Sequence, residues 1–202
     1  MNNLQKVLSV SHWTDNLFSF KITRPKEFKF KSGEFVMIGL PGKDNKPILR
    51  AYSICSPNWS DELEFYSIIV QNGPLTSKLK DIKINDKIIL MTKSTGTLIL
   101  DALLPGKRLF LFSTGTGFAP FASIIRDPEA FEKFEKIIVT HTCRNINELD
   151  YSQSIINKCK TNNILKELIN DKLVYYQTTT REESLSFGRI TNKIIDNSIY
   201  KD

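Results

Sequence analysis

The feature that most constrains the fold is the segment Arg108–Phe121, RLFLFSTGTGFAPF, in which an apolar run leads into a glycine-rich turn. The run Leu109–Phe112 has the length and composition of a buried strand. Pro120 stands where the first turn of a helix tolerates proline, because its nitrogen needs no hydrogen there. A buried strand, a glycine-rich turn and a helix start form the unit with which α/β domains bind phosphate groups.

The turn itself fits neither of two common nucleotide motifs. Pro120 replaces the third glycine of G-x-G-x-x-G, and the G-K-[ST] of a P-loop does not follow. From the motif alone, two interpretations stay open: a nucleotide-binding turn, or an ordinary connection between a strand and a helix. Gly115 and Gly117 are the residues that would let the backbone approach a ligand closely.

From Gly106 onward, predicted strands alternate with predicted helices. The expected strands are 107–113, 136–141 and 172–178, and the expected helices are 118–125, 146–160, 164–169 and 190–195. This alternation indicates βαβ units with a parallel sheet. The right-handed crossover places the loops after the strands along one edge of the sheet, where open α/β sheets bind their ligands.

Three arginines are expected near that edge. Arg144 follows the second strand, Arg181 follows the third, and Arg189 begins the next helix. A guanidinium group suits bidentate capture of a phosphate. A sheet that binds NAD would carry Asp or Glu after its second strand, so an arginine there favours the 2′-phosphate of NADP. The alternative is that they are surface arginines paired with neighbouring carboxylates such as Glu182.

Residues 1 to about 100 have the pattern of β structure. The expected strands are 6–11, 17–22, 35–40, 48–53, 63–70 and 87–91, separated by turns rich in Pro, Gly and Asn. Many short strands at this spacing predict a closed barrel or a sandwich.

This β half holds its own candidate ligand site. The ring of Tyr52 can stack on a planar heterocycle, and Arg50 can neutralise a pyrophosphate. The turn at Gly73 exposes backbone N–H groups in the manner of an anion-binding nest. Taken singly, these features also fit a core aromatic residue, a surface ion pair and an ordinary turn.

Composition limits the class of protein. The chain has 202 residues, 41% of them hydrophobic and 25% charged, which predicts a packed globular protein. The net charge is +6, but the lysines are spread along the chain, and the aromatic and basic stripe of a nucleic-acid-binding barrel is absent. We therefore expect no nucleic-acid partner.

The sequence also predicts the surroundings of the protein. It contains no signal peptide and no apolar run of transmembrane length, so no membrane association is expected. The three cysteines lack a C-x-x-C pattern, and there are only two histidines, so we expect no metal site. Reduced thiols favour a cytoplasmic location.

Taken together, these residues resemble the ferredoxin–NADP(+) reductase family, most closely its bacterial flavodoxin/ferredoxin reductase branch. The resembling segments are RAYS at 50–53, EFYSIIV at 64–70, GPLTS at 73–77, STGTGFAPF at 113–121, HTCR at 141–144 and TREE…FGRIT at 180–191. The resemblance runs from about Leu4 to Thr191. It implies an N-terminal antiparallel FAD-binding β-barrel over residues 1–102 and a C-terminal NADP-binding α/β domain with a parallel sheet over residues 103–202.

The resemblance implies roles for individual residues of the first domain. Arg50 would hold the FAD pyrophosphate, Tyr52 would stack on the isoalloxazine, and Ser53 would lie near its reactive N5. The residues that would line the flavin or surround the FAD phosphates are Tyr66, Ile68, Val70, Gly73, Leu75, Thr76 and Ser77.

In the second domain, Thr116 would lie close to the nicotinamide, with Gly115 and Gly117 under the pyrophosphate of the pyridine nucleotide. Tyr52, Ser53 and Thr116 would then be the catalytic positions. The 2′-phosphate would be bound by Arg144, Arg181 and Arg189.

The activity that the resemblance implies is an FAD-dependent oxidoreductase that moves electrons between NADPH and ferredoxin or flavodoxin. NADPH gives a hydride, whereas the carriers take electrons singly, and the flavin converts between the two modes. The expected partner is an acidic electron carrier, which the positive net charge suits.

The resemblance also predicts a difference from the family, whose chains continue with a further strand that pairs with Leu109–Phe112. Without that strand the sheet would have an open edge. Three explanations stay open: a fragment, an edge covered by a second chain, or a reduced member that binds FAD alone. The alternative function is therefore an FAD-binding protein with impaired or no NADPH turnover.

Overall fold

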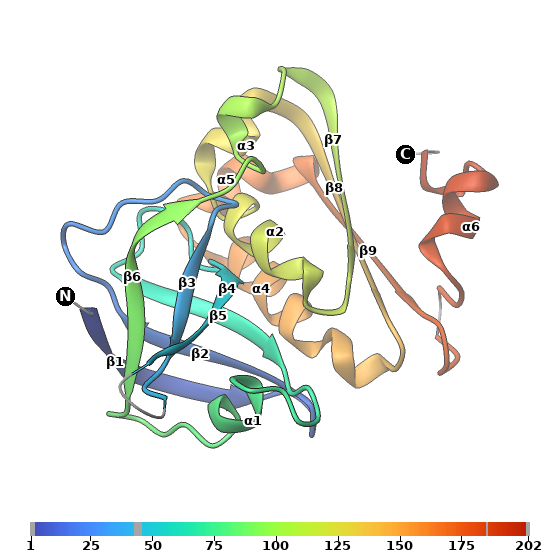
Figure 1. Ribbon diagram of the computed structural model, residues 1–202. Coiled ribbons are helices and arrows are strands. Elements are labelled where there is room, and N and C mark those ends of the chain that lie inside the picture. The colour runs from blue at the N-terminus through green and yellow to red at the C-terminus, as the bar shows by residue number, and fades with distance from the viewer. Residues whose placement is uncertain (1–2, 43–45, 185, 201–202) are drawn as a thin grey trace. The chain divides into compact units, whose positions relative to one another are not determined.

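The computed structural model describes residues 3–42, 46–184 and 186–200. They form a six-stranded sheet with the order β4-β3-β6-β1-β2-β5 and a three-stranded sheet with the order β7-β8-β9 (Figure 1). All pairings in the first sheet are antiparallel and both in the second are parallel. The predicted fold class, an antiparallel barrel followed by a parallel α/β sheet, is confirmed.

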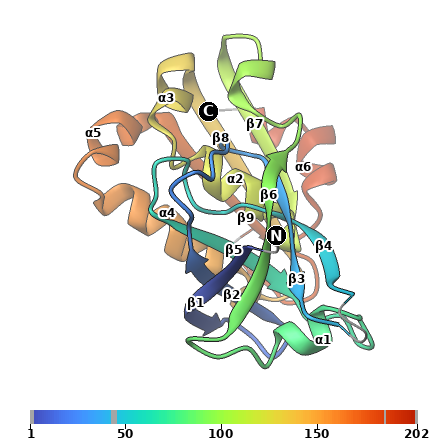
Figure 2. The same ribbon diagram turned by 60° about the vertical axis from the view of Figure 1, so that its left-hand side comes forward.

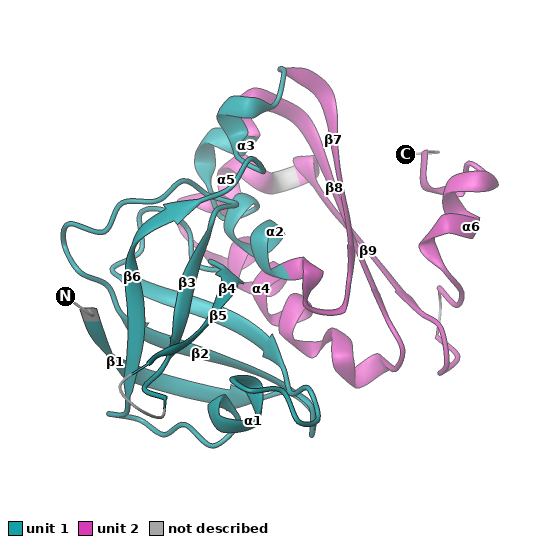
Figure 3. Ribbon diagram, in the orientation of Figure 1, with its two compact units in different colours: residues 1–104, 119–130 teal, residues 105–118, 131–202 magenta. Residues whose placement is uncertain are grey.

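The chain divides into two compact units (Figure 3). The first comprises residues 1–104 and 119–130, and the second comprises residues 105–118 and 131–202. The helix after the glycine-rich turn is thus grouped with the barrel. The predicted domain boundary between residues 102 and 103 stays a prediction.

The strands of the first unit follow the predicted β pattern. They are β1 (Asn3–His12), β2 (Leu17–Thr23), β3 (Phe35–Leu40), β4 (Ile48–Ser53), β5 (Glu62–Ile68) and β6 (Lys87–Thr95). The sequence patterns did not predict the short helices α1 (Thr76–Leu79) and α3 (Pro128–Lys133) or the 3-10 turn η2 (Leu100–Ala102). Helix α2 (Ala119–Ile124) was predicted, and Pro120 lies in its first turn.

The barrel is filled by side chains that alternate along its strands. Phe18 and Phe20 of β2 and Phe65 of β5 are buried, with ring centroids 5.4 Å apart for Phe20 and Phe65. The end strands β4 and β5 approach each other just beyond β4, where Cys55 N–H donates to the Glu64 carbonyl at 2.8 Å. This contact brings together the two edges of the six-stranded sheet, because β4 and β5 stand at its opposite ends.

A buried polar cluster attaches α2 to the barrel. The Arg126 guanidinium donates to the Cys55 carbonyl and to the Glu64 carboxylate, the latter at 3.1 Å. Asp127 accepts from Ser32 Oγ at 2.7 Å. Buried charges are tolerated only when they are paired and hydrogen-bonded, so this cluster specifies where α2 lies on the barrel.

The second unit contains the predicted alternation of strands and helices. Its strands are β7 (Gly106–Thr114), β8 (Phe134–Cys143) and β9 (Leu173–Thr179), and its α-helices are α4 (Asp150–Thr161), α5 (Leu165–Ile169) and α6 (Ile190–Ile195). Four 3-10 turns complete it: η3 (Gly115–Phe118), η4 (Ile146–Leu149), η5 (Asn170–Lys172) and η6 (Ser198–Tyr200). The helix expected over 146–160 therefore begins as a 3-10 turn and becomes α-helical at Asp150.

The register of the parallel sheet aligns the carboxyl ends of its strands. Ser113 of β7 lies opposite His141 of β8, which lies opposite Gln177 of β9. The loops after the three strands therefore leave from one edge, as predicted. Figure 2 shows α4 and α5 on one side of this sheet and α6 on the other.

Strand β7 forms one edge of the sheet. In the part of the chain that the structure describes, no strand pairs with its outer side. Tyr200 of η6 packs edge-on against Phe110 at 5.3 Å, while Phe112 is 40% exposed. Covering of this edge by a second chain stays a prediction.

Among the described residues, no helix is long and apolar enough to cross a membrane.

We predict that Ile38→Ala destabilises the barrel far more than Ile84→Ala. Ile38 on β3, which is paired on both sides, is fully buried, whereas Ile84 in the same unit is 59% exposed. The buried truncation should lower the free energy of unfolding by about 2–5 kcal/mol, and the exposed one by less than about 1 kcal/mol. Urea unfolding measures both, and equal losses would contradict the described core.

Candidate functional site

Tyr52 is held in a fixed orientation by the barrel core. Its hydroxyl lies 2.9 Å from Ser67 Oγ on β5, and its ring makes an edge contact with Phe65 at 6.1 Å. Burial raises the pKa of the Tyr52 phenol, and the hydrogen bond with Ser67 opposes that change. The side chain therefore stays neutral at pH 7 and forms a rigid, half-buried aromatic surface.

Arg50 and Ser53 lie on the same strand as Tyr52. The Arg50 guanidinium is exposed and donates to the adjacent Leu49 carbonyl at 2.7 Å. Within the described residues it takes part in no ion pair. Because its positive charge is not neutralised by a carboxylate of that set, it can serve an anionic ligand.

The loop after β5 closes on itself through Thr76. Val70 N–H donates to Thr76 Oγ1 at 3.2 Å, and Gly73 N–H donates to the Val70 carbonyl at 2.9 Å. A side chain at Gly73 would collide with Thr76 Oγ1, so the loop itself requires glycine there. Leu75 is fully buried in the core, so only its backbone can contact a ligand.

A hollow of about 400 Å³ lies against this loop. It is lined by Asn16, Ile69, Val70, Gln71, Asn72, Ser77 and Lys80. Two of the predicted cofactor residues, Val70 and Ser77, are therefore at its wall. On β5 Tyr66 is buried, while Ile68 at its end and Val70 in the following loop are 44% and 52% exposed and offer apolar surface to a ligand.

The glycine-rich turn of the second unit presents open space. Gly115 has a φ of +50°, in the left-handed region that favours glycine. A Cβ added at Gly115 or at Gly117 would meet no atom within 4 Å. In contrast to Gly73, the room at these positions is not filled by the described protein atoms, which fits the close approach of a nucleotide. Thr116 lies between them and is partly exposed.

Backbone hydrogen bonds draw the arginine-bearing loops together. Arg181 N–H donates to the Arg144 carbonyl at 2.9 Å, so the loops after β8 and β9 touch. Gly188, just before Arg189, donates to the Thr179 carbonyl at 2.7 Å. All three arginines are exposed, and no ion pair involves them in the described part of the chain.

Glu182 was considered above as an ion-pair partner of the arginines, but among the described residues its carboxylate forms no ion pair with them. It accepts a hydrogen bond from Ile146 N–H at 2.8 Å and so links the two loops. The Glu148 carboxylate similarly accepts from Arg144 N–H at 3.0 Å. These acidic side chains hold the backbone that carries the guanidinium groups.

His141 lies under the glycine-rich turn and was not among the predicted site residues. It is fully buried, stacks on Phe118 at 5.0 Å, and places Nε2 2.8 Å from the Gly115 carbonyl oxygen. Its Nδ1 lies 2.7 Å from Ser152 Oγ. Burial lowers the pKa of His141 to about 4, and the Gly115 contact opposes that change. The only signal in the sequence was its place in the HTCR segment.

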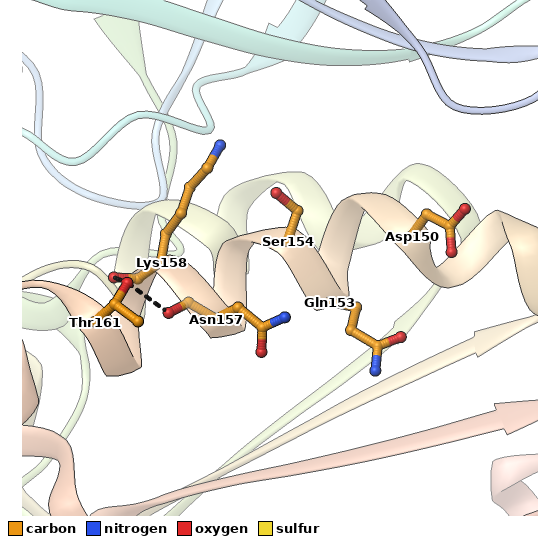
Figure 4. A pocket seen from close by; sticks show the side chains of 6 residues that line it. All are labelled: Asp150, Gln153, Ser154, Asn157, Lys158 and Thr161. Atoms are coloured by element: carbon orange, nitrogen blue, oxygen red, sulfur yellow. Dashed lines mark hydrogen bonds between the residues drawn. The ribbon is translucent and has the colours of Figure 1, made fainter.

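Other candidate sites are less informative. A hollow of about 450 Å³ runs along α4 (Figure 4). Its lining residues are Asp150, Gln153, Ser154, Asn157, Lys158 and Thr161, and it contains no predicted site residue. Among the described residues, no group of three or more His, Cys, Asp or Glu side chains is arranged to hold a metal.

Comparison with known proteins gives the family. A family model described as an oxidoreductase FAD-binding domain matches residues 2–98. The flavodoxin/ferredoxin–NADP reductase of Rhodobacter capsulatus is 54% identical over 198 residues, covering 98% of this chain and 73% of that protein. The chain belongs to the ferredoxin/flavodoxin–NADP reductase family. The ferredoxin–NADP reductase of Azotobacter vinelandii, another member, is 49% identical, covering 99% of this chain and 77% of its own.

A solved structure of the family agrees with the fold. The ferredoxin NADP⁺ reductase of Neisseria gonorrhoeae, determined with bound FAD and NADP, matches with a TM-score of 0.87 at 29% identity. The match covers 98% of this chain and 78% of that chain. The resemblance stated from the sequence motifs is therefore confirmed, while the roles of single residues stay predictions.

The buried His141 predicts a pH dependence of stability. The unfolded chain binds a proton near pH 6.5, whereas the folded chain binds it only near pH 4. Stability should therefore fall as the pH drops from about 6.5 to about 4, by about 3 kcal/mol from this group. Urea unfolding at pH 7 and pH 5 should show a smaller pH effect in His141→Gln than in the unaltered chain.

The control is His12→Gln, which removes the other histidine, an exposed one. If His141→Gln kept the full pH effect, the burial of a neutral imidazole at this position would be contradicted.

Proposed function

We propose that this chain is an FAD-dependent oxidoreductase that transfers electrons between NADPH and ferredoxin or flavodoxin. The observation that carries the proposal is the 54% identity to a flavodoxin/ferredoxin–NADP reductase across 98% of the chain. The comparisons support this function over the alternative of an FAD-binding protein without NADPH turnover.

The first unit is proposed to hold FAD. Tyr52 supplies the stacking surface and Ser53 the neighbouring hydroxyl, while the exposed guanidinium of Arg50 neutralises the pyrophosphate. Apolar contact comes from Tyr66, Ile68 and Val70, and polar contact from the loop of Gly73, Leu75, Thr76 and Ser77. The hollow beside that loop and the exposed apolar side chains of Ile68 and Val70 support the assignment.

The second unit is proposed to hold NADPH. Gly115 and Gly117 leave room for the nucleotide backbone, and Thr116 contacts the nicotinamide end. The guanidinium groups of Arg144, Arg181 and Arg189 bind the 2′-phosphate. Support comes from the shared edge of the sheet, from the hydrogen bond that joins the Arg144 and Arg181 loops, and from the open space at both glycines.

The residues mainly bind and orient. Bound FAD supplies the redox chemistry, because it exchanges hydride with NADPH and single electrons with the carrier. Hydride transfer needs near-attack positioning of the two rings and no general acid or base. The neutral phenol of Tyr52 and the fixed Gly115 carbonyl meet this requirement, because they would orient the bound rings without donating or accepting a proton in the reaction.

The partner is proposed to be an acidic electron carrier, ferredoxin or flavodoxin. The net charge of +6 favours such a carrier, and the association should weaken as salt rises. A cytoplasmic location is proposed because the three cysteines are buried and form no disulfide.

Anaerobic titration with NADPH tests the proposed function. The purified chain loaded with FAD should be yellow and should bleach with one equivalent of NADPH per flavin. Two equivalents of oxidised ferredoxin or flavodoxin per flavin, each accepting one electron, should then restore the oxidised spectrum. A flavin that stays oxidised under excess NADPH would refute the reductase function and leave the FAD-binding alternative.

The 2′-phosphate assignment predicts a loss of cofactor preference. Arg144→Ala and Arg181→Ala should each weaken NADPH binding by about 10-fold or more, because each removes a charge-assisted hydrogen bond, and should leave NADH binding unchanged. Arg108→Ala is the matched control, because Arg108 is an exposed arginine near the opposite end of β7. Equal losses for NADPH and NADH would refute the assignment.

A further inference from the structure

We propose that His141 is a positioning residue for the pyridine nucleotide: its buried imidazole fixes the peptide between Gly115 and Thr116 in the orientation that the bound nucleotide contacts. The inference rests on the proposed function, because it takes the glycine-rich turn as part of the NADPH site. His141 itself does not touch the nucleotide in this proposal, since it is fully buried.

The contacts of His141 assign its hydrogen atoms. A carbonyl oxygen only accepts hydrogen bonds, so the Nε2 atom 2.8 Å from the Gly115 oxygen carries the hydrogen. Nδ1 then carries no hydrogen and faces the Ser152 hydroxyl at 2.7 Å, whose single hydrogen lies within reach of both Nδ1 and the Leu149 carbonyl. Stacking on Phe118 fixes the plane of the ring. Because burial keeps the imidazole neutral at pH 7, this arrangement persists under physiological conditions.

A second hydroxyl extends the chain of hydrogen bonds. Tyr175 Oη lies 2.7 Å from Ser152 Oγ, which also lies 2.8 Å from the Leu149 carbonyl. Burial raises the pKa of the Tyr175 phenol, so it stays a donor. The relay therefore runs from Tyr175 on β9 through Ser152 on α4 and His141 on β8 to the turn. Successive bonds of this kind strengthen one another in a buried setting.

The hydrogen bond from His141 to the Gly115 carbonyl also determines the direction of the next backbone amide, the Thr116 N–H. The described chain contains no cis peptide bonds, and in a trans peptide the carbonyl and the following N–H point in opposite directions. With the Gly115 carbonyl directed at His141, the Thr116 N–H is directed away from it. A glycine adopts other backbone conformations at little steric cost, and no atom within 4 Å would contact a Cβ at Gly115. Gly115 begins the 3-10 turn η3, and the hydrogen bond from His141 adds a side-chain constraint that favours this one orientation of the peptide.

Two substitutions separate positioning from packing. His141→Leu removes both hydrogen bonds and keeps an apolar side chain in the buried site. His141→Gln retains an amide N–H that can reach the Gly115 carbonyl. Isothermal titration of the FAD-loaded protein should give the dissociation constants of NADP⁺ and of 2′-phospho-AMP, which has the 2′-phosphate but lacks the pyrophosphate and the nicotinamide.

The expected result is selective. His141→Leu should raise the dissociation constant of NADP⁺ by about 10-fold, which is the scale of one lost buried hydrogen bond. It should raise the dissociation constant of 2′-phospho-AMP by less than about twofold. His141→Gln should recover part of the NADP⁺ affinity. If His141→Leu does not fold, Ser152→Ala takes its place, because it leaves the imidazole intact and removes the hydroxyl beside Nδ1. It should weaken NADP⁺ binding by about threefold and leave 2′-phospho-AMP binding unchanged.

Three results would overturn the inference. Unchanged NADP⁺ affinity in the folded variants would show that the turn does not depend on His141. Equal weakening of both ligands would show a general structural role. Failure of the unaltered, FAD-loaded protein to bind NADP⁺ would refute the proposed function and this inference with it, and that failure is seen before any variant is made.

Discussion

The pairing of β8 with strands on both sides is the constraint on which the second unit depends. Residues 137–143 of this strand are all buried, and they hold β7 and β9 in a register that ends all three strands at one edge. Parallel pairing forces the following loops to leave together, so the glycine-rich turn and two arginine-bearing loops meet there without any contact specific to a ligand. The same strand supplies His141, which lies under the turn.

The barrel combines a closed aromatic core with a half-buried tyrosine. One edge of the Tyr52 ring packs on Phe65, and the Tyr52 hydroxyl lies 2.9 Å from Ser67 Oγ. The core therefore fixes the orientation of Tyr52 while part of its side chain stays accessible. The buried pair of Arg126 and Glu64 fixes α2 to the same barrel, so the chain that leaves the glycine-rich turn is anchored by charges that cannot easily be separated.

The sequence predicted the strands well, because the periodicity of apolar residues and the turn residues reported the same boundaries. It did not predict the short helices α1 and α3. At the site, the alternation of strands and helices was sufficient to predict that the loops after the three strands share one edge. The relay through His141 was not predictable, because Ser152 and Tyr175 come from distant elements and only the folded chain brings them to the imidazole. Leu75 was predicted to surround the FAD phosphates because it lies in the loop after β5, but its side chain is part of the barrel core.

We propose that the pyridine nucleotide lies on the edge where β7, β8 and β9 end. Amide hydrogen exchange of the FAD-loaded protein, measured with and without NADP⁺, tests it most directly. A nucleotide bound at this edge should slow exchange at residues 115–117, in the loop after Cys143 and at residues 180–189. Protection confined to other segments, such as the outer face of α4, would contradict it.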